Sequence, residues 1–199
     1  MTKILNNLIK KNILKLITGN FEKLAPTYYR LISEWMNSSY EVFNDIDKYR
    51  IILYLINKDF EHYIKIKKIE SYDNFFMFDK SLELDRINII EISKSLNIPK
   101  ESTRRKILDL EKLNVLQKIG KKIYIDRSAY RLVQPKNTLK NLSALLSKIS
   151  EILKIENLID KSLNVDEVSE HLKDNFSYCW YYFYIFIFTL TLRWKKQLG

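Results

Sequence analysis

Apolar residues recur every three or four positions along most of the chain, a spacing that places them on one face of a helix. This pattern predicts helices over residues 2–17, 26–35, 41–67 and 137–155. We expect Gly19-Asn20 to end the first helix and Pro26 to open the second. The Asn-Ser-Ser run at residues 37–39 is expected to separate the second helix from the third.

Two further expectations concern the third helix and the segment after it. One apolar face of the third helix is expected to run from Val42 through Ile46 and Phe60 to Ile64. Residues 70–83 combine aromatic and acidic residues without a clear period. We therefore expect a loop or a short extended segment there.

The centre of the chain holds two short helical patterns. Asn88 precedes an apolar run and Glu91 follows three residues later, which predicts a helix with a capping-box start. Asn97 is a candidate for the left-handed residue that ends this helix, and Pro99 disfavours helix at Ile98. A second helix is expected over residues 100–113, with these residues facing inward: Thr103, Ile107, Leu110 and Leu113.

A hairpin pattern follows the second of these helices. Asn114 is expected to end the helix, because asparagine tolerates the left-handed backbone. Residues 115–118 and 122–125 have the pattern of two short strands, and Gly120 lies in the turn between them. The expected order is therefore helix, three-residue turn, helix and β-hairpin, which is the layout of a winged helix-turn-helix.

Residues 89–125 resemble the DNA-binding domain of bacterial winged-helix transcription regulators of the MarR and CRP-like kind. The shared features are an apolar helix, a turn ending in Ile98-Pro99, a second helix rich in Ser, Thr and Arg, a Leu110-Glu111 pair, and a strand followed by a glycine-containing wing. The similarity covers about a fifth of the chain. Asn114 stands where these families usually have glycine, and the wing is short, which weakens the expectation of deep minor-groove contact.

Positive charge is concentrated in the same part of the chain. The net charge is +10, but 27 Ile, 26 Lys and 16 Asn against 3 Ala indicate an AT-rich genome, whose codons favour lysine. Residues 86–136 nevertheless carry 13 Lys and Arg against 5 Asp and Glu, whereas residues 1–85 and 137–199 each have a net charge of +1. A localised basic segment is typical of a nucleic-acid contact.

The resemblance implies that the helix at residues 100–113 is the recognition helix, which lies in the major groove of DNA. Neighbouring residues of a helix point about 100° apart, so one of Arg104 and Arg105 is expected to contact bases and the other a phosphate. We assign Arg105 to base contact, with Ser102 beside it. Lys100 and Lys106 also lie in the first two turns of this helix, whose residues reach the base edges. Backbone contacts are expected from the wing and from the preceding helix: Lys118, Lys121, Lys122, Ser93 and Lys94.

The last part of the chain predicts a helix that begins near Asn164 and ends in an uncharged, aromatic run over residues 176–192. These 17 residues are short for a membrane span, and their Tyr and Trp content suits an interface better than a bilayer centre. In a membrane, Arg193 and the lysines after it would keep the C-terminus on the inner side, because positive residues favour that side. The basic segment would then lie outside, away from DNA. We expect a helix buried all round, in the core or in a homodimer interface that also uses the N-terminal helices.

Motifs for catalysis are not evident. The single cysteine, Cys179, has no neighbouring cation and is expected to be a small buried residue, and His62 and His171 lie far apart. The sequence contains no Gly-rich phosphate loop and no nucleophile motif. We therefore expect no enzyme activity, no cofactor and no metal. One cysteine and the absence of a secretory signal pattern favour a cytoplasmic protein.

These observations predict a mainly α protein with three regions: N-terminal helices over residues 1–83, a winged helix-turn-helix over 84–135, and C-terminal helices over 136–199. The expected function is sequence-specific binding of double-stranded DNA in transcription regulation, as a homodimer. The alternatives are a plasmid or phage replication initiator, a winged-helix protein–protein interaction module without DNA, and a membrane-tethered protein.

Overall fold

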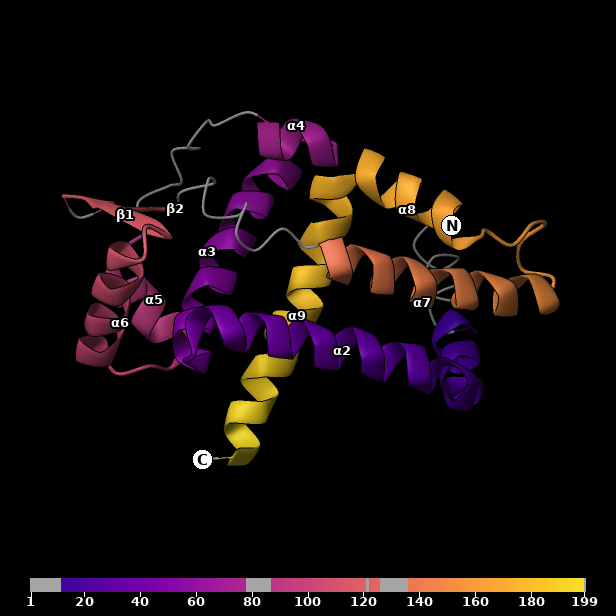
Figure 1. Ribbon diagram of the computed structural model, residues 1–199, viewed down its shortest axis with the longest axis horizontal. Coiled ribbons are helices and arrows are strands. Elements are labelled where there is room, and N and C mark those ends of the chain that lie inside the picture. The colour runs from indigo at the N-terminus through magenta and orange to yellow at the C-terminus, as the bar shows by residue number, and fades with distance from the viewer. Residues whose placement is uncertain (1–11, 78–86, 121, 126–135, 199) are drawn as a thin grey trace, which may run out of the picture. The chain divides into compact units, whose positions relative to one another are not determined.

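The computed structural model describes residues 12–77, 87–120, 122–125 and 136–198, and the protein is mainly helical (Figure 1). Residues 12–19 are helical, and Asn20 forms a turn before the next helix, as Gly19-Asn20 predicts. The remaining elements are α2 (Phe21–Phe43), α3 (Ile46–Lys65), α4 (Tyr72–Met77), α5 (Ile89–Leu96), α6 (Lys100–Lys112), β1 (Leu116–Ile119), β2 (Lys122–Ile125), α7 (Lys136–Ile155), α8 (Val165–Asp174) and α9 (Phe176–Leu198).

The chain divides into two compact units, and each unit is built from two segments of the sequence. One unit joins the chain up to Asn37 with the residues from Pro135 to His171, and the other joins Ser38 to Gln134 with the residues from Leu172 onward. This division differs from the three consecutive regions that the sequence predicts. It differs because α3 and α9, which lie far apart in the sequence, pack against each other.

In the first unit, polar side chains of α7 hold the segment that leads into α8. The Ser147 hydroxyl donates to the carbonyl oxygen of Leu163 at 2.9 Å, and Ser150 accepts from the Leu163 N–H at 2.9 Å. Asn164 then starts α8 as predicted. Its side chain accepts from the Glu167 N–H at 2.9 Å, and Glu167 accepts from the Asn164 N–H at 2.8 Å, which is a reciprocal capping box.

Helix α2 corrects two predicted boundaries. It begins at Phe21, so Pro26 lies inside the helix, and it continues through the Asn-Ser-Ser run at residues 37–39. Pro26 removes one helical hydrogen bond and costs about 3 kcal/mol inside a helix, whereas Asn and Ser have low helix propensity and cost below about 1 kcal/mol each. Burial of Leu24, Leu31 and Trp35 at helical spacing on one face favours helix over this stretch.

The start of α3 lies five residues later than the sequence predicts. Asn44 adopts a left-handed backbone with φ of 46°, which ends α2, and the Asp45 side chain then accepts from the N–H groups of Asp47 and Lys48. Because of this boundary, Val42 and Ile46 are exposed, and the prediction that they belong to the inward face was wrong.

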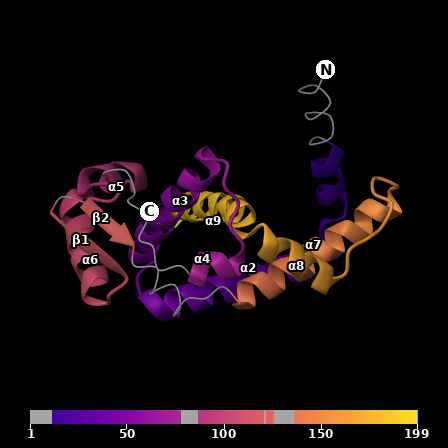
Figure 2. The ribbon, with the colours of Figure 1, turned by 90° about the horizontal axis from the view of Figure 1, so that it is seen from above.

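In the second unit α3 is the central helix. It packs against α9 on one side and against α5, α6 and β2 on the other, and both views show it between them (Figures 1 and 2). Residues 49–56 are all buried, as expected for a helical stretch that has neighbours on every side.

An aromatic cluster joins α3, α4 and α9. Phe60 of α3 stacks on Phe75 with ring centroids 5.1 Å apart, and Phe176 at the start of α9 lies 5.3 Å from Phe75. Burial of Phe75 accounts for α4, a short helix in a stretch that the sequence predicts to be a loop or extended. The prediction was wrong because α4 is positioned by ring contacts with Phe176 of α9, which have no counterpart in an apolar period of the sequence. These contacts come from Tyr72, Phe75 and Phe76.

Helix α9 is separate from α8 and is buried on one side only, which corrects two further predictions. Asn175 forms a turn between the two helices. The residues that recur along the inner face of α9 are buried: Phe176, Trp180, Phe183 and Ile187. Tyr178, Tyr182 and Phe186 are exposed on another face. Among the residues that the structure describes, no helix has the length and hydropathy of a membrane-spanning segment.

Candidate nucleic-acid interface

Helix α5 and the turn after it form as the local sequence predicts, except that only the Asn88 side of the expected capping box is present and Glu91 accepts a hydrogen bond from Tyr54 instead. The Asn88 side chain accepts from the N–H groups of Ile90 and Glu91, each at 3.0 Å, and so caps α5. Asn97 ends the helix in a left-handed conformation with φ of 51°. The Ser93 hydroxyl donates to the carbonyl oxygen of Ile98 at 2.7 Å, which closes the turn onto α5.

Helix α3 holds α5 through two residues one helical turn apart. The Arg50 guanidinium donates through Nη2 to the carbonyl oxygen of Leu96 at 2.7 Å and through Nη1 to Asp47 at 2.8 Å. The Tyr54 hydroxyl donates to Glu91 Oε1 at 2.8 Å. Glu91 is therefore used to join two helices, in addition to its place in the first turn of α5.

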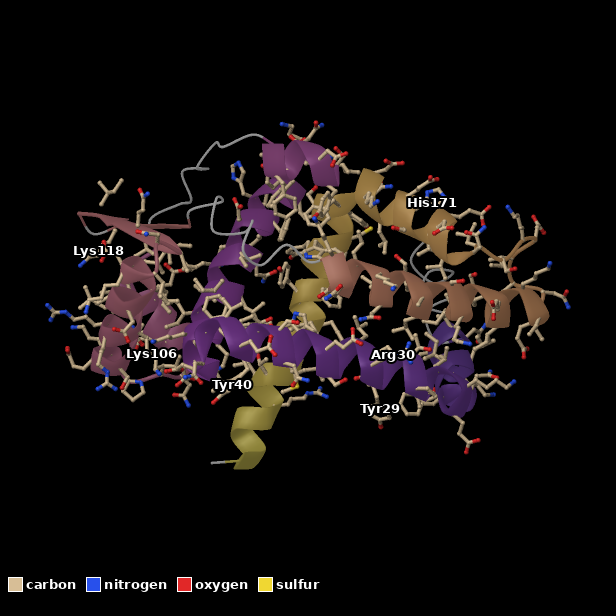
Figure 3. The ribbon with its side chains drawn as sticks, viewed as in Figure 1. Tyr29, Arg30, Tyr40, Lys106, Lys118 and His171 are labelled. Carbon is tan, nitrogen blue, oxygen red and sulfur yellow. The ribbon has the colours of Figure 1, made fainter. Side chains whose placement is uncertain are left out.

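The N-terminal end of α3 holds α6 by two ion pairs. Lys106 Nζ contacts Asp45 Oδ2, and Lys48 Nζ lies 3.1 Å from Asp109 Oδ2. Partial burial raises the pKa of Asp45, but hydrogen bonds from Lys106 and from the Lys48 and Asp47 N–H groups outweigh it, so the pKa is lower than usual. Lys106, marked in Figure 3, thus lies on the flank of α6 that faces α3.

The opposite face of α6 is exposed and mostly charged. Thr103, Ile107 and Leu110 are buried, as predicted, whereas Leu113 at the end of the helix is exposed, so its predicted inward position was wrong. Directly opposite the buried residues is a row at i, i+4, i+7 and i+11, which we call the outer stripe: Glu101, Arg105, Leu108 and Lys112.

Arg104 and Arg105 are both exposed, and Arg104 lies beside the outer stripe. Within residues 12–77, 87–120 and 136–193, no carboxylate forms an ion pair with either guanidinium. Lys100 is exposed in the first turn of α6, and Ser102 is half-buried there. The N-terminal half of α6 therefore presents two arginines and a lysine to solvent.

The segment after α6 contains an antiparallel pair of strands. Leu116 of β1 pairs with Ile125 of β2, and Ile119 pairs with Lys122. Gly120, with φ of 64°, occupies a left-handed position that favours glycine. Leu116 and Ile123 are buried, and the α3 and α6 helices both contact this pair of strands.

The other predicted contact residues have mixed surroundings. Lys94 of α5 and Lys118 of β1 are exposed, and Lys118 is marked in Figure 3. Ser93 is half-buried and engaged in the turn. Lys121 lies outside the described residues, and Lys122 is described in its backbone only.

The sequence did not predict that α3 holds α5 and α6 in place, because α3 was assigned to a separate N-terminal region. The signal was present in residues 49–56, where the apolar run has no polar face and is interrupted only by Arg50. Such a helix must be buried on all sides, and a buried arginine must have hydrogen-bond acceptors from another element.

Metal-ligating and thiol side chains are the other candidates for chemistry in the described part of the chain. No group of three His, Cys, Asp or Glu side chains there has the arrangement of a metal site. Cys179 is half-buried, and burial raises the pKa of its thiol, which disfavours the reactive thiolate. Comparison with family models, curated proteins and solved structures found no match to this chain.

Proposed function

We propose that α3, α5, α6 and the two strands form a winged helix-turn-helix that binds double-stranded DNA in a sequence-specific manner. In this proposal the chain is a cytoplasmic transcription regulator, and α6 is the recognition helix in the major groove. The observation that carries the proposal is the exposed face of α6, where Arg104 and Arg105 have no carboxylate partner among the described residues.

The way α6 is held supports this assignment. A helix that enters a groove must keep its outer face exposed while its other sides are fixed, because contacts to base edges depend on position. Lys106 and Asp109 fix one flank of α6 to α3, and Thr103 and Ile107 are buried beneath it. The face that carries Arg105 is thereby positioned without taking part in the packing.

The residue roles follow from these surroundings. Arg105, with Ser102, contacts bases, and Arg104 holds a phosphate. Lys94, Lys100 and Lys118 contact the flanking backbone, together with Lys121 and Lys122 of the hairpin. Ser93 and Lys106 already have protein partners, so we assign them to positioning of the turn and of α6.

The exposed face of α9 supports a homodimer. Tyr178 and Tyr182 lie one turn apart with ring centroids 5.0 Å apart, and both are exposed. Tyrosine is enriched in protein interfaces because it buries a large surface at low conformational cost. We propose that this face and the N-terminal helices join two copies, which would bind two half-sites about 34 Å apart.

The test is fluorescence anisotropy with labelled duplexes that tile the DNA around the protein's own gene, measured across a salt series. Wild type is compared with Arg104→Ala/Arg105→Ala. A matched control, Lys140→Ala/Lys148→Ala, removes two exposed positive charges from α7, outside the proposed interface. The logarithm of the affinity should fall with the logarithm of salt concentration at a slope of about −0.9 for each phosphate contact.

The proposal requires one duplex to bind far more tightly than the others, and the α6 variant to lose this preference while the control keeps it. Equal binding of all duplexes would show a non-specific contact and would contradict sequence-specific regulation. Absence of binding at low salt would reject DNA binding altogether and would favour a protein-interaction module.

A further inference from the structure

Leu108 is an apolar residue in the middle of the exposed, charged face of α6. Its exposed fraction is 43%, although Ile107 beside it is 1% exposed and Leu110 is fully buried. On the outer stripe it lies three residues after Arg105 and four residues before Lys112. The helix therefore presents a leucine side chain to solvent between two cations.

This setting limits what can cover Leu108. Arg105 and Lys112 would have to be desolvated together with it, and an apolar protein surface offers no compensation for two buried cations. The major groove of DNA offers negative charge for the two cations, because phosphates line its edges. It also offers an apolar contact for Leu108, because the C5-methyl group of thymine projects into it. An apolar side chain on a recognition helix is suited to that methyl group.

We propose that Leu108 contacts the C5-methyl group of one thymine in each half-site and so specifies an A·T pair at that position. The inference rests on the proposed binding of DNA by α6. Leu108 lies about 4.5 Å from Arg105 along the helix axis, and stacked base pairs are about 3.4 Å apart. The thymine is therefore expected one or two base pairs from the base that Arg105 contacts.

The experiment replaces each thymine of the tightest-binding duplex, one at a time, with deoxyuridine. This change removes the C5-methyl group and leaves the O4 acceptor and the base pairing in place. Affinities are measured for wild type, for Leu108→Ala, and for Leu113→Ala as a matched control. Leu113 is an exposed leucine at the end of the same helix and lies off the outer stripe.

We expect wild type to lose about fourfold in affinity at one thymine of each half-site, the effect of one buried methyl group. Leu108→Ala should bind the thymine and deoxyuridine duplexes equally, and Leu113→Ala should discriminate as wild type does. If wild type binds every deoxyuridine duplex as tightly as the parent, or if Leu108→Ala keeps the discrimination, the inference is wrong. A protein that selects no duplex at all would instead reject the proposed function.

Discussion

Arg50 donates a hydrogen bond from Nη2 to the backbone carbonyl oxygen of Leu96, 2.7 Å away and 46 residues later in the sequence. Leu96 is the last residue of α5, where helix carbonyl groups lack partners within the helix. A cation at this end also interacts favourably with the helix dipole. The contact therefore fixes the end of α5, and with it the turn from which α6 begins.

Replacement of Arg50 by methionine should destabilise the fold by about 3 kcal/mol, because the Leu96 carbonyl then loses its buried donor. Only 1% of the Arg50 side chain is exposed, so water cannot take its place. Urea unfolding followed by circular dichroism measures the change. The same substitution at the exposed Arg30 should stay within about 0.5 kcal/mol of wild type. Equal stability of the two variants would contradict the role of Arg50.

Replacement of Asn97 tests the left-handed end of α5. With φ of 51°, alanine at this position should cost about 1 kcal/mol, whereas glycine should be nearly neutral. Thermal unfolding of Asn97→Ala and Asn97→Gly gives the difference, and the glycine variant controls for loss of the asparagine side chain. A glycine variant as unstable as the alanine variant would show that the side chain, and not the backbone conformation, matters.

The sequence predicts α5, its caps and most of α6 because their signals are local. Asn88, Asn97 and Pro99 act on backbone groups within a few residues, so their effect does not depend on the rest of the fold. Local start and stop signals did not predict that α2 continues through Pro26. The burial of its long apolar face outweighs one unfavourable residue, and that burial depends on the rest of the fold.

The candidate site was only partly predictable, because some of its contacts join residues that lie far apart in the sequence. Arg104 and Arg105 are exposed, as helical spacing relative to Thr103 and Ile107 requires. The partner of Lys106 is Asp45, 61 residues away, and no local pattern indicates that contact. The one-sided exposure of α9 also depends on which of its aromatic residues face α3 and α4.

The pair between Asp45 and Lys106 should make stability depend on pH. The folded pKa of Asp45 is below its ordinary value of 3.8, so the pair stabilises the fold above that value. This contribution should be lost as the pH falls below 3.8 through the folded pKa. Asp45→Asn keeps a good helix cap but removes the charge, so its unfolding free energy should fall less between pH 7 and pH 3 than that of wild type.

A second background isolates the ion pair from other effects of the substitution. In Lys106→Met, the change Asp45→Asn should have a much smaller effect on the pH dependence, because the main partner of the carboxylate is already absent. Urea unfolding at several pH values measures both pairs of variants. An unchanged effect of Asp45→Asn in the Lys106→Met background would assign the pH dependence to the cap and not to the pair.

The exposed face of α9 gives the test of the homodimer. Tyr182 is 52% exposed, and in a two-fold symmetric dimer its substitution by arginine would place two cations in one apolar interface. Sedimentation equilibrium of Tyr182→Arg should show a dissociation constant raised by at least tenfold. Ile155→Arg, at an exposed apolar residue at the end of α7 and outside the proposed interface, should behave as wild type. The monomeric variant should also lose affinity for DNA with two half-sites more than for a single half-site. A wild-type protein that stays monomeric at all concentrations would contradict the dimer, and equal dissociation of both variants would place the interface elsewhere.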